Sequence, residues 1–348
     1  MKSLSKYLLW MVIFLCITGV AVSYAFYRYL TTSAFYAEAS ILVEIKPGTH
    51  FSELAHYLEG QNVIRKPKWW TAYAVATGQA EKVKAGEYQI QPGSSPLQIL
   101  DMFINGRVVV YQLTLVEGWR FVDVLNKLAQ QEKLVHLSAG LSPQEVMVLL
   151  GKPGEHPEGR FFPDSYQYVA GNSDIDILKR AYARLEQVLT EEWHQRADNL
   201  PYETPYEALI MASIVEKETG VADEREQIAG VFVRRLQKGM RLQTDPTVIY
   251  GLGDAYQGNL QRQHLAQKTR YNTYLIKGLP PTPIAMAGRA AIQAALHPAS
   301  GSSLYFVARG DGSHFFSDTL TEHTKAVQQF QIKQRTKQYQ SSPKIEAK

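Results

Sequence analysis

The chain has 348 residues, which is long enough for two or three folded units with their own cores. Its formal net charge is +4, from 37 Lys and Arg against 33 Asp and Glu spread along the chain, which argues against a nucleic-acid-binding surface. Cys16 is the single cysteine, and no Cys/His cluster has zinc-like spacing. We therefore expect no disulfide, no cofactor, no metal and no nucleic-acid partner.

The first predicted element is a membrane span at residues 7–27. These 21 residues carry no charge, and as a helix they would be about 30 Å long, the thickness of a bilayer's hydrocarbon core. Lys2 and Lys6 precede the run, which favours a cytoplasmic amino terminus at 1–6, a single pass through the membrane and a position outside the cytoplasm for the chain from about residue 30 onward. The alternative is a signal peptide cleaved at "AEA", residues 37–39, but that site lies too far beyond a run that is itself too long.

An internal repeat follows, because residues 43–58 match residues 113–128 without a gap, seventy positions later. Gly48 aligns with Gly118, and Phe51 aligns with Phe121. Each copy predicts an alternating strand, a glycine turn and a helix with apolar residues at spacings of three and four. Residues 84–95 and 157–173 also resemble each other, since both combine a glycine-aromatic strand with a second glycine turn.

The first copy resembles LysM modules, which bind N-acetylglucosamine chains through a strand, a glycine turn and a helix. The resemblance implies a LysM-like domain at 40–106, followed by a second strand-turn-helix unit at 107–172 that joins it to the domain that comes next in the chain. Trp69, Trp70 and Tyr88 could face sugar, because aromatic rings offer flat apolar area with a polar group. Alternatively, these rings fill the core of a small α+β unit.

From residue 173 onward the pattern is mainly helical, and we assign 173–332 to a further domain of an α+β protein. Ser173 is the expected cap of a long helix, and Thr204 with Glu207 forms a capping box for a helix that ends at Gly220. The polar residues 333–348 predict a disordered basic tail. The other predicted elements are a helix at 223–239, loops, a helix near 285–296, strands at 303–309 and 314–318, and a helix from about 320.

The stretch "ASIVEKETG", residues 212–220, places two glutamates at the end of an apolar helix. Val215, Ile214 and Met211 lie three, four and seven positions before Glu218, on its own face. Glu216 points about 160° away, over a less apolar side. A carboxyl at the edge of apolar packing has a raised pKa and can donate a proton near neutral pH. The alternative is a solvated glutamate, or one paired with Lys217 or Arg225.

Several motifs resemble the endolytic murein transglycosylases, the MltG or YceG-like family. They are "EGRFFPDSY" at 158–166, "ASIVEKET" at 212–219, "LQTDPTVIYGLG" at 242–253, "YNTY" at 271–274 and "GLPPTPIA" at 278–285. The resemblance covers nearly the whole chain apart from the tail and places the catalytic carboxyl on Glu218. It implies that 173–332 is the catalytic domain and that this domain lies in the periplasm, anchored to the cell inner membrane. One departure is at Met286 and Ala287, where the family pattern leads us to expect Asn and Pro.

The reaction implied by this resemblance is cleavage of the β-1,4 bond between N-acetylmuramic acid and N-acetylglucosamine without water. Glu218 would protonate the glycosidic oxygen and then accept the proton of the muramic C6 hydroxyl as that oxygen attacks C1. The product is a 1,6-anhydromuramoyl end. Because the nucleophile belongs to the substrate, a second protein carboxylate is not required.

The "QTDP" and "YNTY" segments are candidates for the glycan groove, because they offer hydrogen-bonding groups and stacking faces. The alternative for Asp245 is a turn or helix cap before Pro246, and for the tyrosines it is core packing. His297, His314 and His323 lack ligand-like spacing, and we assign them no metal role. The predicted substrate-binding residues are Gln243, Asp245, Tyr250, Tyr271, Asn272 and Tyr274.

A membrane-anchored enzyme of this family is expected to act on nascent peptidoglycan strands beside the synthases, the penicillin-binding proteins, and to terminate their elongation. Two other functions stay open at this point. A lysozyme-type hydrolase would use Asp245 or another acid as its second carboxylate. A non-enzymatic wall-binding scaffold would use the repeat alone.

Overall fold

The computed structural model describes residues 2–33, 35 and 39–333, and it divides the chain into two compact units. Unit 1 comprises residues 1–111 and 167–172, and unit 2 comprises residues 112–166 and the chain from Ser173 onward. Helices dominate and the strands are few and short, so the α+β class is confirmed. Residues 334–348 of the basic tail predicted at 333–348, and most of the "AEA" site, lie outside the described residues.

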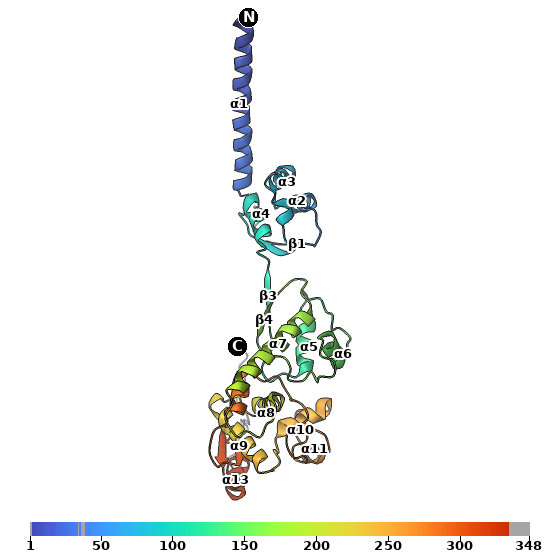
Figure 1. The fold of residues 1–348 in the computed structure, drawn as a ribbon, viewed down its shortest axis with the longest axis vertical. Helices are drawn as coiled ribbons and strands as arrows, with labels where there is room; N and C mark the ends of the chain where they lie inside the picture. Colours follow the sequence, from blue (N-terminus) through green and yellow to red (C-terminus); the bar gives the residue numbers. More distant parts are fainter. Residues whose placement is uncertain (1, 34, 36–38, 334–348) are drawn as a thin grey trace. The chain divides into compact units, whose positions relative to one another are not determined.

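Unit 1 begins with α1 (Lys2–Thr31), the long helix at the blue end of the chain in Figure 1. Its Lys6–Thr31 portion is long and apolar enough to cross a membrane, judged by length and composition. The last turn of α1 is part of the folded unit, because Leu30 is buried in the core of unit 1.

The predicted strand, glycine turn and helix are present in unit 1. β1 (Ile41–Ile45) pairs antiparallel with β2 (Gly86–Ile90), with Val43 opposite Tyr88. Gly48 lies between β1 and α2 at φ 83°, a conformation that glycine adopts without steric cost. The elements that join and follow the strands are α2 (Phe51–Gly60), α3 (Pro67–Ala76), the 3-10 turn η1 (Ala80–Lys82) and α4 (Pro96–Asn105).

Two of the three aromatic residues singled out in unit 1 belong to its core. Trp70 and Tyr88 are fully buried. The Trp70 indole N–H donates to the Pro96 carbonyl at 2.9 Å, and the Tyr88 hydroxyl donates to the Lys84 carbonyl at 2.7 Å. Their polar groups are therefore satisfied inside the protein, and their rings are not available to sugar.

The second copy has the same order of elements as the first: strand, two helices, strand, helix. β3 (Val110–Thr114) pairs with β4 (Ser165–Val169), and the division between the units falls within these strands. Gly118 has φ 77°, close to the value at Gly48. The similarity extends further than the aligned motifs, because a capping serine begins the last helix of each copy. The helices of the second copy are α5 (Phe121–Ala129), α6 (Pro143–Leu149) and α7 (Asp174–His194).

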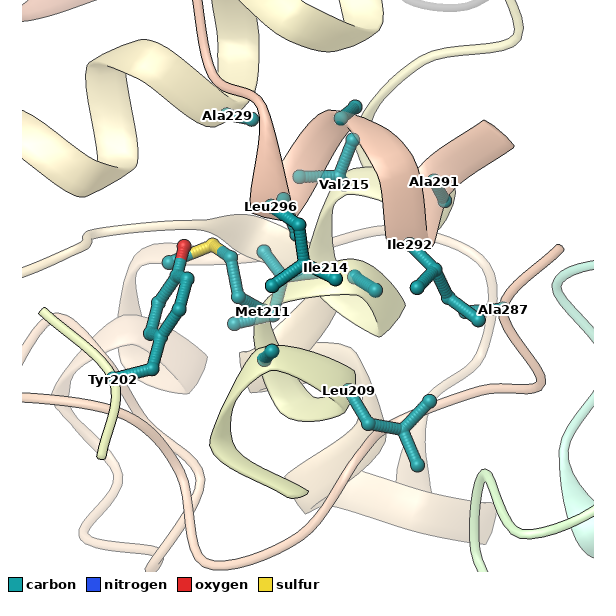
Figure 2. Close-up of a cluster of buried hydrophobic side chains, with 14 of the residues drawn as sticks. Tyr202, Leu209, Met211, Ile214, Val215, Ala229, Ala287, Ala291, Ile292 and Leu296 are labelled. Atoms are coloured by element: carbon teal, nitrogen blue, oxygen red, sulfur yellow. The ribbon is translucent and has the colours of Figure 1, made fainter. Parts of the chain in front are cut away.

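The core of unit 2 surrounds α8 (Pro205–Glu218), the helix that carries both candidate glutamates. It packs with α9 (Arg225–Gln237) and α12 (Arg289–Leu296). Figure 2 shows Ile214 and Val215 of α8 beside Leu296 of α12. The remaining elements are η2 (Ala222–Glu224), α10 (Asp245–Leu252), η3 (Gly253–Ala255), α11 (Arg262–Ala266), the antiparallel pair β5 (Tyr305–Ala308) and β6 (His314–Ser317), α13 (Leu320–Val327) and the π-helix η4 (Gln328–Lys333).

The segment after α9 differs from the prediction of loops, because Asp245–Leu252 is helical. Pro246 lies in the first turn, where its fixed φ suits a helix and its missing N–H has no cost. The β-branched residues that follow favoured a non-helical prediction, and burial of Thr247 and Val248 overrides that preference.

Met286 and Ala287, the two residues that differ from the family pattern, lie where the second copy joins the rest of unit 2. The Gly118 N–H donates to the Met286 carbonyl at 2.8 Å, and the Met286 N–H donates to the Trp119 carbonyl at 2.7 Å. Both side chains at the departure are buried. The pairing uses backbone groups, so it does not require a particular side chain at 286.

Gly159 provides a test of this junction. It has φ 73°, and a Cβ there would overlap Pro283 and lie 3.2 Å from the Ala285 carbonyl oxygen. Gly154 has φ 84° and open space around the same position. We expect Gly154→Ala to cost about 1–2 kcal/mol in backbone strain, and Gly159→Ala to cost about 1–3 kcal/mol more through the clash. Urea denaturation of both variants measures the difference, and equal losses would contradict the predicted close packing.

Candidate active site

Glu218 is the last residue of α8, at the end of a completely buried run. Thr204 caps the helix with its side chain, Glu207 completes the capping box, and residues 208–215 are all buried. Glu207 is thus used for capping, as the sequence predicts. The helix stops because Thr219 is extended, at φ −142° and ψ 137°. The apolar packing of α8 therefore ends where its final carboxyl emerges.

Glu218 lines a cavity of about 680 Å³ in unit 2. One side comes from α8 and from residues 242–249, and another comes from β5, β6, α13 and η4. Among the described residues, Glu218 and Asp245 are the acidic ones that line this cavity. A space of this volume is typical of sites that enclose a ligand.

The carboxyl of Glu218 is held in an environment that favours its neutral form. Burial is the largest effect and raises the pKa of Glu218 to about 7. The Thr244 hydroxyl donates a hydrogen bond to its Oε1 and opposes the rise, because this bond stabilises the carboxylate. The charge of Asp245 raises the pKa further, and that of Arg235 lowers it. Near neutral pH the group can both give and accept a proton, which suits general acid–base chemistry.

Thr244 is a site residue that the sequence analysis missed. It is buried, and its backbone N–H donates to the Thr273 hydroxyl at 3.0 Å, while the Thr247 hydroxyl donates to its carbonyl at 2.8 Å. These contacts orient Thr244 toward Glu218. The only sequence signal is the position of this threonine between Gln243 and Asp245 in the "QTDP" segment, a candidate for the glycan groove in which Thr244 itself has no assigned role.

Three of the six predicted binding residues share the cavity with Glu218. Gln243 lines it with φ 52°, an uncommon backbone conformation for a residue other than glycine. Asp245 and Tyr274 also line it, and the Tyr274 hydroxyl donates to the Asp245 carboxylate at 2.7 Å. The "QTDP" and "YNTY" segments therefore meet at the cavity.

The other three, Tyr250, Tyr271 and Asn272, are not among the cavity-lining residues. Tyr250 donates to Glu158 at 3.1 Å, and its ring meets that of Tyr271 edge-on at 4.8 Å between centroids. Asn272 is fully buried, and its side-chain amide donates to the Gln267 carbonyl at 2.8 Å. Their contacts position the loop that carries Tyr274, and a sugar-binding role for them stays a prediction.

The opposite wall contains further groups that sequence reasoning gave no role. Arg235 is buried and donates to the Leu304 carbonyl at 2.7 Å, and its guanidinium lies 5.0 Å from the Tyr305 ring centroid. His323 stacks on the same tyrosine at 5.2 Å. His314 and His323 both line the cavity. No group of His, Cys, Asp or Glu within residues 2–33, 35 and 39–333 has an arrangement that could hold a metal.

Glu216 faces a different environment from Glu218. Its carboxylate accepts the Gly288 N–H at 3.0 Å, at the start of α12. Burial and then the nearby Glu117 raise its pKa. It does not line the cavity, and neither does Glu158, whose pKa burial raises to about 7. Of these three carboxyls with raised pKa values, the one that opens to the cavity is Glu218.

The chain is similar to known proteins over most of its length. The model of the YceG-like family matches residues 43–329. The chain belongs to the YceG-like family. An endolytic murein transglycosylase of Bacillus subtilis (strain 168) is 28% identical over 311 residues, which is 84% of this chain and 86% of that protein. A Streptococcus pneumoniae protein of the same name is 24% identical over 339 residues, covering 86% and 61% of the two chains.

A solved structure supports the same family. A yceG-like protein from Listeria monocytogenes, in a crystal structure at 2.6 Å resolution, superposes with a TM-score of 0.50 at 30% identity. The alignment covers 83% of this chain and 99% of that one. The similarity therefore includes both units and not the cavity alone.

Thr244→Val tests the control of the Glu218 pKa. A general acid must be protonated, so the rate on isolated glycan strands should fall as the pH rises through a pKa of about 7. Removing the hydroxyl destabilises the carboxylate and raises the pKa of Glu218, so this fall should move to higher pH by about one unit. Thr244→Ser keeps the donor and should keep the wild-type profile. A shift to lower pH in the Val variant would contradict the assignment.

Proposed function

We propose that the protein is an endolytic lytic transglycosylase that cleaves the β-1,4 bond between N-acetylmuramic acid and N-acetylglucosamine in peptidoglycan. Membership of the YceG-like family and the names of the B. subtilis and S. pneumoniae relatives support this proposal. The observation that carries it is one carboxyl, Glu218, whose pKa is raised to about 7 where it lines a large cavity.

The proposed reaction uses Glu218 twice. The protonated carboxyl gives its proton to the glycosidic oxygen, the C1–O bond of muramic acid breaks, and positive charge develops at C1 and the ring oxygen. The C6 hydroxyl oxygen of the same sugar then attacks C1, and its proton passes to the Glu218 carboxylate. Water is not consumed, and the product carries a 1,6-anhydromuramoyl end. The enzyme is thus a carbon–oxygen lyase.

The neighbouring residues have two proposed roles. Gln243, Asp245 and Tyr274 would hydrogen-bond or stack with the sugars on either side of the scissile bond, since all three line the cavity. Thr244 would fix the orientation of Glu218 through its hydrogen bond. Tyr250, Tyr271 and Asn272 would hold the loop that presents Tyr274, as their buried contacts suggest.

Glu218→Gln, with Glu216→Gln as its matched control, tests the reaction. Glutamine keeps the size of the side chain but cannot donate an acidic proton, so Glu218→Gln should lower the rate by on the order of 10²–10⁴-fold. Glu216 lies on the same helix outside the cavity, and an amide oxygen can still accept from Gly288. The Glu216 variant should therefore keep most of the activity.

Mass analysis of the products from intact sacculi completes this test. Anhydro ends, one water lighter than reducing ends, are expected from the wild type. Ordinary reducing ends would instead support a hydrolase in which Asp245, the other acid of the cavity, activates water. Equal rates for Glu218→Gln and the wild type would remove Glu218 from the mechanism. Absence of cleavage by all three proteins would favour a binding scaffold.

We also propose that unit 1 is a LysM-like glycan-binding module. The antiparallel pairing of β1 with β2 around α2 and α3 supports this, together with a cavity of about 400 Å³ between the β1–α2 turn and residues 80–85. Polar groups for sugar hydroxyls are present there in Thr49, His50 and Glu81.

The glycan-binding role of unit 1 is tested by measuring how much protein is retained on sacculi. The inactive Glu218→Gln protein is used so that the sacculi are not cleaved. Replacing Thr49 and Glu81 together by alanine should weaken retention several-fold, because both side chains line the 400 Å³ cavity. Glu44→Ala changes an exposed residue of β1 outside the cavity and serves as the control. If all three proteins are retained equally, the cavity is not the glycan site.

The location of the protein is part of the same proposal. The apolar α1 supports a single-pass anchor in the cell inner membrane, with residues 1–6 cytoplasmic and both folded units periplasmic. An anchored enzyme of this activity would cut nascent strands close to the bilayer and terminate their elongation. Penicillin-binding synthases are then the expected neighbours.

A further inference from the structure

The segment "RKPKWW", residues 65–70, combines three basic side chains with two tryptophans at the start of α3. Arg65, Lys66 and Lys68 are exposed. Trp70 points into the core of unit 1 and is fully buried, whereas Trp69 is only partly buried. The side chain of Trp70 thus stabilises the fold, whereas that of Trp69 does not belong to the core.

Trp69 contacts the end of α1 instead. Its ring centroid lies 5.6 Å from that of Phe26 and 5.8 Å from that of Tyr29. The Tyr29 hydroxyl donates to the Lys66 carbonyl at 3.3 Å, and the Lys66 ammonium lies 4.3 Å from the Trp69 ring centroid. These contacts hold the start of α3 against the last two turns of α1. Figure 1 shows the end of α1 beside α4 of the same unit.

This packing determines the depth of α3 if α1 crosses a membrane. The uncharged run of α1 ends at Tyr27, one residue after Phe26, so Phe26 would lie at the boundary of the hydrocarbon core. Trp69, in contact with Phe26, would then lie at the same boundary. Tryptophan and tyrosine rings concentrate at this depth, because it accommodates both their apolar area and their polar groups.

The basic side chains near Trp69 also agree with a position at the boundary of the hydrocarbon core. Arg28 on α1 and the exposed Arg65, Lys66 and Lys68 are all at this end of unit 1. Glu59 is an acidic group close enough to act on Tyr29, and these four basic residues outnumber it. Basic side chains next to a span are attracted to anionic lipid headgroups.

We propose that residues 65–69, together with the end of α1, form a second membrane-contacting face that binds anionic phospholipid headgroups of the bilayer surface. The proposal rests on the anchoring role proposed for α1 and adds to it that unit 1 lies on the bilayer. The face has the two features that such a surface requires, an aromatic ring at the hydrocarbon boundary and basic groups beside it. Unit 1 would then be held at the membrane surface by its own fold.

Spin-label depth measurements on the full chain test this face. With Cys16→Ser removing the native thiol, a nitroxide is attached at Lys68→Cys, at Lys46→Cys as the exposed control after β1, or at Val12→Cys within α1. The protein is reconstituted in vesicles of phosphatidylcholine with phosphatidylglycerol. Collision rates with oxygen and with a water-soluble nickel complex report the depth of each label.

We expect the label at 68 to collide with the nickel complex several-fold less often than the label at 46. The difference should shrink in vesicles of phosphatidylcholine alone, because the headgroup charge is then missing. Equal nickel collision at 68 and 46, with the label at 12 shielded, would overturn the second face while the anchor stands. A label at 12 that is open to nickel would overturn the anchor, and the second face with it. An unchanged difference in phosphatidylcholine would overturn the part of the proposal that assigns anionic headgroups.

Discussion

The site depends on the balance between burial of the Glu218 carboxyl and the single hydrogen bond from Thr244. Burial alone would keep the group neutral, and full solvation would leave it ionised at neutral pH. The hydrogen bond offsets part of the cost of the charged form, so both forms are accessible near a pKa of about 7. The apolar end of α8 and the buried threonines around Thr244 are needed to hold this balance.

The second copy of the repeat contributes to the site by holding α8 and its neighbours. The Lys217 ammonium, next to Glu218 in the chain, donates to the Gly118 carbonyl at 3.1 Å. The same glycine turn pairs with Met286 just before α12, and Glu216 accepts from Gly288. The glycine turn of the second copy thus fixes the end of the helix that carries the proposed proton donor. The first copy has its corresponding turn beside a cavity of its own.

Much of the fold follows from local sequence signals, whereas the site depends on distant contacts. The capping boxes at Ser173 and Thr204 and the glycine turns at 48 and 118 are predictable, because each depends on neighbouring residues. The helical period also predicts that Glu216 and Glu218 lie on different faces of α8, because it depends only on their spacing in the sequence. Thr244 was missed because its partners Glu218 and Thr273 are 26 and 29 residues away. The helix at Asp245–Leu252 was missed because burial outweighs its β-branched preference.

A raised pKa does not by itself identify the proton donor in this protein. Glu158, Glu216 and Glu218 are all shifted upward, mainly by burial. The Glu158 carboxylate accepts from the Phe121 N–H and the Tyr250 hydroxyl, and that of Glu216 accepts from Gly288, so both serve internal contacts. Glu218 also accepts a hydrogen bond, from the Thr244 hydroxyl, but it differs from the other two because it lines the cavity. Its position at the cavity distinguishes Glu218 from the other two and supports its proposed role, since a buried acid can catalyse only where the reacting atoms can reach it.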